Sequence, residues 1–206
     1  MKTAVAVLLF AAPAFAVELT IDPAHSTAAF GIKHMMVSTV HGNFGKVSGT
    51  VNYDPKDPAK SSANIQIDPA TVDTRNEKRD AHLKSADFFD VQKCPEMGFK
   101  SKSIHKSGDK YKVSGDFTMH CVTKPLTLEA SFSDNPLKSP AGALVYAGSA
   151  SGKLKRSEWG LTWNKALESG GALVSDDVNL DLDFEYVPRK EEAAKQSQAE
   201  SKTKKD

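Results

Sequence analysis

The 206-residue sequence has only two cysteines, almost no net charge and no long hydrophobic run. The formal charge is +1 with both signs interspersed, and no basic stripe alternates with aromatic residues, so the usual marks of a nucleic-acid partner are missing. The apolar run at residues 4–12 is well below the roughly 20 residues that a membrane-spanning helix needs. We therefore expect neither nucleic-acid binding nor stable membrane insertion.

The motifs of common catalytic and metal sites are also missing. The sequence has no G-x-S-x-G, no phosphate-binding glycine loop, no H-E-x-x-H and no C-x-x-C. Its six histidines show no metal-ligand spacing. Asp80 and His82 are two residues apart on an expected helix, so they project in different directions. We predict no metal, no cofactor and no enzyme, although an enzyme with Asp80 and His82 as acid and base stays an alternative.

The N-terminal segment has the features of a secretory signal peptide. Lys2 precedes the apolar run, and Ala14-Phe15-Ala16 has the small-x-small pattern of a cleavage site. We expect residues 1–16 to be removed by cleavage between Ala16 and Val17, which implies an exported protein.

The C-terminal segment, residues 188–206, is different in composition from the rest of the chain. It carries many charges and no aromatic or branched aliphatic residue, so it cannot bury enough apolar surface to become ordered. We expect a disordered charged tail there and one folded domain at residues 17–187, which is long enough for a substantial core.

Strict alternation of apolar and polar residues dominates the expected domain and is typical of half-buried antiparallel strands. The alternating stretches are 29–34, 47–53, 63–68, 113–120, 126–132 and 178–186, with further strands expected near 97–105 and 144–156. A total of about eight strands predicts a closed barrel or a two-sheet sandwich. The polar faces carry charged and hydroxyl side chains, so the apolar faces point inward, the reverse of an outer-membrane barrel.

Periodicity does not decide whether such an interior is filled or hollow. Aromatic residues and methionine at inward positions favour an ordinary packed core when periodicity is the only guide. Small inward residues leave room for a ligand, but they also alternate with large ones in filled barrels. These small residues are Gly49, Ala63, Gly115, Ala130, Ala150 and Gly152. A filled barrel serving as a stress or interaction module therefore stays an alternative.

One helix is expected between the strands. In "TRNEKRDAHLKS", Thr74 and Glu77 have the spacing of a capping box, which predicts a helix from about residue 75 to residue 84. A second short helical turn is expected from Asn164 to the glycine pair at 170–171.

The two cysteines, Cys94 and Cys121, are expected to pair because exported proteins fold in oxidising compartments. A hairpin with a three-residue loop at 107–109 would place Phe99 opposite Phe117. The same register brings Cys121 opposite Pro95, one residue from Cys94. The bond would be a structural staple, because the spacing of a redox site is absent.

Four stretches resemble the YceI-like family. They are "IDPAHSTAAFGIKHMMVSTVHGNFGKVSGTVNYD" at 21–54, "TVDTRNEKRDAHLKSADFFDVQKCPEMGFKS" at 71–101, "GDFTMHCVTKPLTLE" at 115–129 and "LKRSEWGLTW" at 154–163. The resemblance covers nearly the whole expected domain, and the segment at 79–90 is its most specific part. The family more often has an aromatic residue in place of Cys94 and a glycine in place of Cys121, and this paired departure supports the disulfide.

The resemblance implies an all-β, eight-stranded, lipocalin-like antiparallel barrel with one or two short helices, exported to the periplasm. It implies a binding or transport protein that holds an isoprenoid or quinone-like lipid inside the barrel, with no established enzymatic activity. The oligomeric state stays open, a homodimer included. The expected ligand-binding residues are Phe30, His34, Phe44, Arg79, His82, Phe88, Phe89, Phe99, Phe117, Met119, Phe132, Leu154, Arg156 and Trp159.

Overall fold

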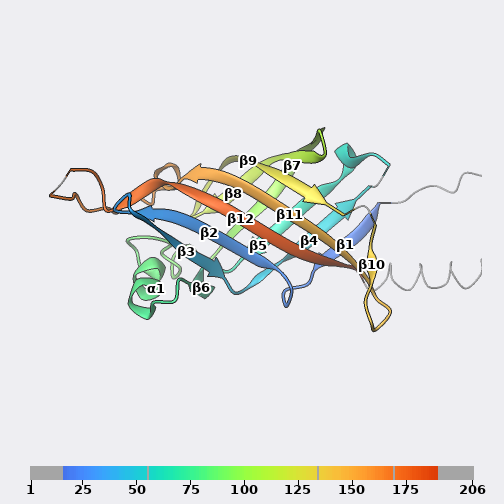
Figure 1. Ribbon diagram of the computed structural model, residues 1–206, viewed down its shortest axis with the longest axis horizontal. Coiled ribbons are helices and arrows are strands. Elements are labelled where there is room, and N and C mark those ends of the chain that lie inside the picture. The colour runs from blue at the N-terminus through green and yellow to red at the C-terminus, as the bar shows by residue number, and fades with distance from the viewer. Residues whose placement is uncertain (1–15, 55, 134, 169, 190–206) are drawn as a thin grey trace, which may run out of the picture.

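The computed structural model describes residues 16–54, 56–133, 135–168 and 170–189 (Figure 1). Almost all of the expected signal peptide and of the expected charged tail lies outside the described residues. The first strand begins at Val17 and the last ends at Pro188.

The described chain is built from antiparallel strands with one α-helix and three short 3₁₀ turns. The strands are β1 (Val17–Ile21), β2 (Thr27–His34), β3 (Ser38–Phe44), β4 (Val47–Tyr53), β5 (Ser62–Ile67), β6 (Val72–Asp73), β7 (Met97–Ser107), β8 (Lys110–Met119), β9 (Val122–Phe132), β10 (Leu137–Lys138), β11 (Leu144–Lys155) and β12 (Val174–Pro188). The helical segments are η1 (Pro58–Lys60), η2 (Pro69–Thr71), α1 (Glu77–Lys84) and η3 (Arg156–Trp159).

These strands close into an eight-stranded antiparallel barrel, as predicted. The long strand β12 completes the closure, because it pairs with β11 along one edge and with β2 and then β1 along the other. β1 and β2 therefore act as one bent strand. β3 and β4 do the same, since β2 pairs with β3 and β1 with β4.

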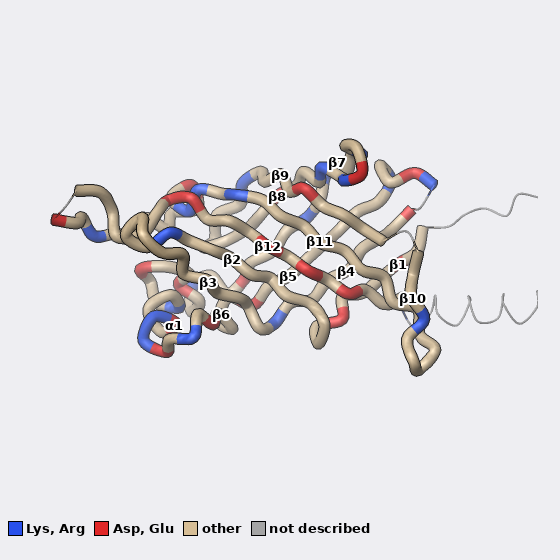
Figure 2. Tube along the Cα trace, viewed as in Figure 1, with Lys and Arg blue, Asp and Glu red and all other residues tan. Residues whose placement is uncertain are grey.

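The inward faces follow the alternation in the sequence. On β12, for example, Leu182, Phe184 and Tyr186 point into the barrel while the acidic residues between them face solvent. Figure 2 shows Lys and Arg interspersed with Asp and Glu over the outside of the barrel. Among the described residues, no helix has the length and hydropathy required to cross a bilayer.

The β7–β8 hairpin has the predicted register at Phe99 and Phe117 but a different turn. Ser107 pairs with Lys110, so the loop has two residues rather than three. A bulge between Ser101 and Ser103 adds one residue to β7 and restores the register farther along.

The helix α1 begins two residues later than expected, and the predicted capping box is wrong. Asn76 is the N-cap, and its side-chain oxygen accepts a hydrogen bond from the Arg79 backbone N–H at 3.0 Å. Arg75 adopts a left-handed φ of 60°, so the chain turns after Thr74 and places Asn76 at the helix start.

The expected second helix at 164–171 is also absent, and a small antiparallel turn occupies this place. Ala166 pairs with Ala172 as an isolated bridge, and the Leu167 N–H donates to the Gly171 carbonyl at 3.1 Å. Gly170 and Gly171 have φ values of 84° and 91°, so the glycine pair reverses the chain instead of ending a helix.

Candidate functional site

The barrel encloses a cavity of about 500 Å³ that runs along its length. The lining includes His82 of α1 and its neighbour Trp163. It also includes Tyr53 at the end of β4 and Tyr111 near the start of β8, and these strand ends lie away from α1 (Figure 1). Most side chains between them are aliphatic or aromatic. Cavities of roughly 300–1,000 Å³ hold small ligands in proteins. The filled core that periodicity favours is therefore wrong for this barrel.

Small inward side chains explain part of this space. Ala63, Ala130 and Ala150 line the cavity, as their size suggests. Two of the inward glycines have another role. A Cβ on Gly49 would lie 2.3 Å from the Asn64 carbonyl oxygen, and one on Gly115 would lie 2.3 Å from a neighbouring backbone oxygen. These glycines allow close strand pairing rather than creating room for a ligand.

The cavity brings together almost all the residues expected to bind ligand. Those that line it are Phe30, His34, Phe44, Arg79, His82, Phe88, Phe89, Phe99, Phe117, Met119, Phe132, Leu154 and Arg156. Trp159 does not line it. Its side chain is 1% exposed, packs edge-on against Phe117 and donates from Nε1 to the Phe117 carbonyl at 3.0 Å. It therefore supports a lining residue from behind.

Sequence reasoning missed several aromatic lining residues, chiefly Trp163, Tyr53, Tyr111 and Tyr186. Burial raises the pKa of the Tyr186 phenol, so this group stays protonated at neutral pH. Alternation already placed Tyr53 and Tyr186 on inward faces, although neither was expected to bind ligand, and Tyr111 continues the inward face of β8. Trp163 lies outside the strands, and no periodic pattern marks it.

Three aromatic groups frame the α1 end of the cavity. The His82 ring lies edge-on to Phe88 and Trp163, with centroid distances of 5.0 and 4.9 Å. Its Nε2 is 2.7 Å from an Asp87 carboxylate oxygen. Phe88 and Phe89 are both buried and line the cavity. The short helix thus places its imidazole beside the apolar opening.

Asp80 and His82 do not form the acid–base pair that a lipid-modifying enzyme would need. One Asp80 oxygen accepts from both the backbone N–H and the hydroxyl of Thr74. Arg79 also binds Thr74, donating from Nε to the hydroxyl oxygen at 2.7 Å and from the guanidinium to the carbonyl at 2.8 Å. Buried Thr74 therefore anchors the start of α1, and Arg79 adds positive charge beside the cavity.

Arg156 is the one buried charged residue among the described residues. Its Nε donates to the Ser175 carbonyl at 2.9 Å, and its guanidinium also donates to the Leu161 carbonyl. Burial lowers the pKa of Arg156, and the nearby Asp176 carboxylate opposes this shift. Two donors are therefore already occupied by backbone carbonyls, one on β12 and one in the segment that follows η3.

The predicted disulfide between Cys94 and Cys121 is present, with an S–S distance of 2.04 Å and a Cα–Cα distance of 5.2 Å. It joins the segment that follows Phe89 to the tight β8–β9 turn. Since Phe88 and Phe89 line the cavity, the bridge holds part of the lining in place.

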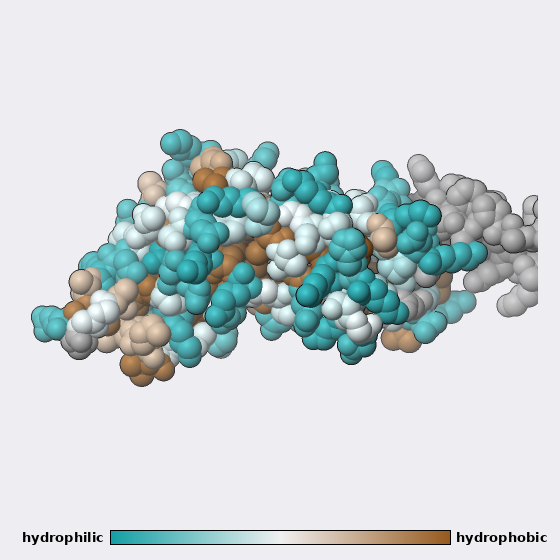
Figure 3. Space-filling view, turned by 90° about the horizontal axis from the view of Figure 1, so that it is seen from above, coloured by the Kyte–Doolittle hydropathy of each residue, from teal (hydrophilic) through white to brown (hydrophobic). Residues whose placement is uncertain are grey.

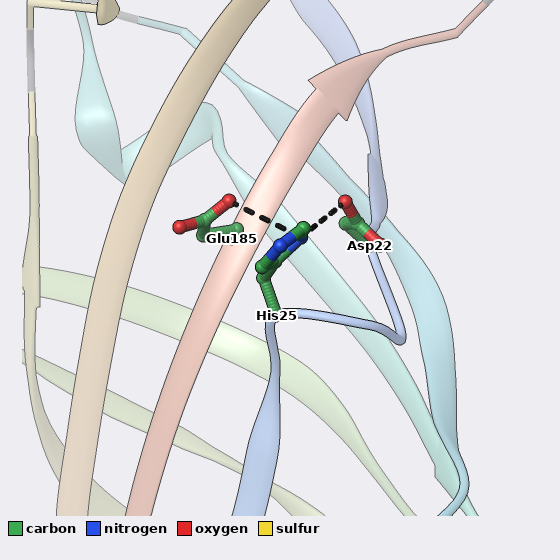
Figure 4. Close-up of side chains that lie close together, drawn as sticks. All are labelled: Asp22, His25 and Glu185. Atoms are coloured by element: carbon green, nitrogen blue, oxygen red, sulfur yellow. Dashed lines mark hydrogen bonds and ion pairs between the residues drawn. The ribbon is translucent and has the colours of Figure 1, made fainter. Parts of the chain in front are cut away.

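A second cluster lies outside the cavity, where β1 turns into β2 (Figure 4). His25 Nδ1 lies 3.0 Å from Asp22 and 3.8 Å from Glu185 on β12. The hydrogen bond to the Asp22 carboxylate and the charge of Glu185 raise the pKa of His25. This cluster was not predicted from the sequence, because Glu185 is remote in the chain from Asp22 and His25. The imidazole lies between two carboxylates, and its contact with Glu185 joins the β1–β2 turn to β12.

Comparison with known proteins agrees with this architecture. The family model of the YceI-like domain matches residues 19–186. The chain belongs to the YceI-like family. A UPF0312 protein of Serratia proteamaculans is 37% identical over 190 residues, which cover 91% of this chain and 95% of that protein.

Two solved structures are similar to the YceI-like chain. The Campylobacter jejuni YCEI protein is 32% identical, with a TM-score of 0.64, covering 77% of this chain and 90% of that one. A polyisoprenoid binding domain from Saccharophagus degradans is 14% identical, with a TM-score of 0.59, covering 84% of this chain and 99% of that one. At this identity, the second similarity shows the shared fold alone.

Proposed function

We propose that this YceI-like protein binds one long apolar lipid of the polyisoprenoid kind in its barrel and carries it in the periplasm. The observation that carries the proposal is the elongated cavity lined mostly by aliphatic and aromatic side chains. The polyisoprenoid binding domain with the same fold supports the lipid class. The signal-peptide pattern of residues 1–16 supports export.

Burial of the lipid chain supplies the driving force in this proposal. Each methylene removed from water contributes about 0.8 kcal/mol, less the cost of immobilising the chain. A lining without a regular pattern of polar partners suits a ligand that is apolar along its length. The binding is therefore expected to depend more on chain length than on any single contact.

A polar head group is expected at the α1 end of the cavity. Lys78, Arg79 and His82 line this end and offer hydrogen-bond donors. Arg79 and Arg156 are weaker candidates than their charge suggests, because each already uses two donors within the protein. Arg79 donates twice to Thr74, and Arg156 donates to two backbone carbonyls. The head group would then lie beside α1 while the chain extends toward Tyr53 and Tyr111.

The test is to block the cavity without changing the barrel. Ala150 on β11 lines the cavity, whereas Ala147 on the same strand is exposed on the outer face. Ala150→Phe is expected to abolish uptake of a nonaprenyl alcohol from detergent micelles, measured by native mass spectrometry. Ala147→Phe, the matched control, is expected to bind like the parent protein. Equal uptake by both variants, or no uptake by the parent protein, would overturn the proposal.

A further inference from the structure

Three consecutive apolar residues form the exposed tip of the β2–β3 hairpin. Met35, Met36 and Val37 are 45%, 70% and 84% exposed. With Leu137, they make up the exposed large hydrophobic residues of the described chain. We call residues 35–37 the apolar tip. Isolated apolar residues are common on protein surfaces, but a run of three at one projecting turn marks an interaction site more specifically.

The apolar tip belongs to the rim of the cavity. His34 and Val40, which flank it on β2 and β3, both line the cavity. The Met35 N–H donates to the Leu173 carbonyl at 2.8 Å, and Leu173 also lines the cavity. Figure 3 shows apolar side chains gathered at the end of the molecule that carries this hairpin. An apolar surface therefore continues from the interior of the barrel to its outer edge.

Folding does not explain why large apolar residues occupy this turn. Met35 and Met36 have φ values of 52° and 59°, the left-handed region that favours glycine, asparagine and aspartate. Their side chains extend into solvent instead of the core, so the strained backbone is not offset by burial. Exposed apolar side chains on a strained turn are expected where the protein surface contacts an apolar partner.

The charge of the hairpin indicates what that partner is. Residues 27–44 contain Lys33, His34 and His41 but no Asp or Glu, although the whole chain is nearly neutral. The adjoining turn contributes Lys165 and Glu168, which balance each other. β12, which pairs with β2, carries Asp176 and Asp177, and basic residues lie near both: Arg156 near Asp176, and Lys153 3.5 Å from Asp177. An apolar tip on a hairpin without acidic residues suits the interface of a bilayer that contains anionic lipids.

We propose that the apolar tip docks on an anionic phospholipid bilayer and brings the α1 end of the cavity to the membrane surface. The lipid chain then moves between the bilayer and the barrel along a continuous apolar path, without crossing water. This inference rests on the proposed function, because it supplies the route by which that ligand enters. The partner of the apolar tip is the bilayer surface, to which the protein binds peripherally.

The test compares two ends of the same barrel. Met36→Ser combined with Val37→Ser removes the most exposed part of the tip. Leu137→Ser removes the exposed hydrophobic residue of β10 at the opposite end (Figure 1) and is the matched control. All proteins are the full chain as purified, with the same N-terminus checked by intact mass. The measurement is flotation with phosphatidylethanolamine vesicles that contain phosphatidylglycerol.

We expect the tip variant to lose about tenfold in vesicle binding, as partial burial of two apolar side chains implies, and the Leu137 variant to bind normally. In the tip variant, nonaprenyl alcohol uptake from vesicles should also fall, while its uptake from detergent micelles stays unchanged. Equal flotation of both variants would overturn the inference, as would equal parent binding to purely zwitterionic vesicles. A change in oligomeric state without a change in flotation would assign the tip to a protein interface instead.

The two proposals fail in different ways. A parent protein that takes up the prenyl alcohol from micelles but does not float with anionic vesicles refutes membrane docking alone. A parent protein that takes up no prenyl lipid from either source refutes the proposed function.

Discussion

The β8–β9 turn and the β2–β3 turn have the same unusual backbone but different surroundings. Each places two consecutive non-glycine residues in the left-handed region, with φ values of 51° and 59° at His120 and Cys121. In this turn both residues are anchored. His120 donates from Nδ1 to the Trp159 carbonyl at 3.0 Å, and Cys121 is bonded to Cys94. The anchors offset the strain.

In the β2–β3 turn, the strained residues are Met35 and Met36, and both side chains face solvent. A left-handed conformation of this kind costs about 1–3 kcal/mol per non-glycine residue. In the β8–β9 turn, contacts inside the protein therefore offset the strain. The β2–β3 turn is held through the backbone, by the Met35 N–H bond to the Leu173 carbonyl, while its side chains stay in solvent. Exposed side chains on a strained turn are expected where they contact something outside the protein.

The largest expected effect comes from removing the covalent anchor of the β8–β9 turn. Replacing both cysteines, Cys94→Ser with Cys121→Ser, should lower the free energy of unfolding by about 2–4 kcal/mol, because the unfolded chain gains freedom. Urea denaturation measures this change, and the parent protein under reducing conditions should match the double variant. A loss below about 0.5 kcal/mol would show that the bridge does not anchor the turn.

The hydrogen-bonded anchor of the same turn should contribute less. Asparagine tolerates the left-handed conformation but does not have the imidazole that donates to the Trp159 carbonyl. His120→Asn should therefore lower the free energy of unfolding by about 1 kcal/mol, the net value of one hydrogen bond. Urea denaturation with the disulfide intact isolates this contribution. An unchanged urea concentration at the unfolding midpoint would mean that His120 does not offset the strain in the β8–β9 turn.

The same replacement in the β2–β3 turn should have the opposite sign. Met36→Asn relieves left-handed strain and removes no buried contact, so we expect the free energy of unfolding to rise by about 0.5–1 kcal/mol. Vesicle binding should fall at the same time. If Met36→Asn lowers the free energy of unfolding as His120→Asn does, the Met36 side chain also stabilises its turn, and the contrast between the two turns is wrong.

The smallest effect is expected at a third turn, between β1 and β2, which is anchored by charge. The hydrogen bond to Asp22 and the charge of Glu185 raise the pKa of His25 above its ordinary value, so protonation favours the folded state. This contribution is fully present below about pH 6.5, the unfolded pKa, and is lost as the pH rises through the folded value. An NMR titration of the imidazole measures it.

The matched variants for the charged turn are Asp22→Asn and Glu185→Gln. Asp22→Asn should move the pKa of His25 toward its ordinary value by the larger amount, because the Asp22 hydrogen bond is the largest cause of the shift. Glu185→Gln should have a smaller effect in the same direction. An unshifted pKa in the parent protein would show that the turn is not held by charge.

Most of the barrel could be predicted from the sequence because strand faces follow a local rule. Alternation placed Phe99, Phe117 and Phe184 on the inner face, where the structure has them. The register that aligned Phe99 with Phe117 also brought the two cysteines close enough to pair, although the turn and the bulge were not foreseen. The shorter turn and the bulge in β7 shift the register in opposite directions, so Phe99 still pairs with Phe117.

The candidate site could be predicted only in part. Inward aromatic residues were found by periodicity and motif residues by family resemblance, but neither method separates a side chain that lines a space from one that lies behind it. Trp159 shows the difference, because its Nε1 bond to the Phe117 carbonyl turns it away from the cavity. The cap of α1 was misplaced because Thr74 and Asn76 are both good capping residues, and the left-handed Arg75 selects between them.

By itself, the sequence determined about eight strands and their inward faces, because these depend on period-two alternation, and its register brought the two cysteines within one residue of pairing. Alternation left a closed barrel and a two-sheet sandwich open, and the family resemblance selected the barrel. Tertiary structure decided that the barrel is hollow, because void volume depends on how all the strands pack at once. It also decided that His25 meets Glu185 and that the apolar tip adjoins the cavity. Each of these depends on the closure of the sheet, which brings together residues that are distant in the chain.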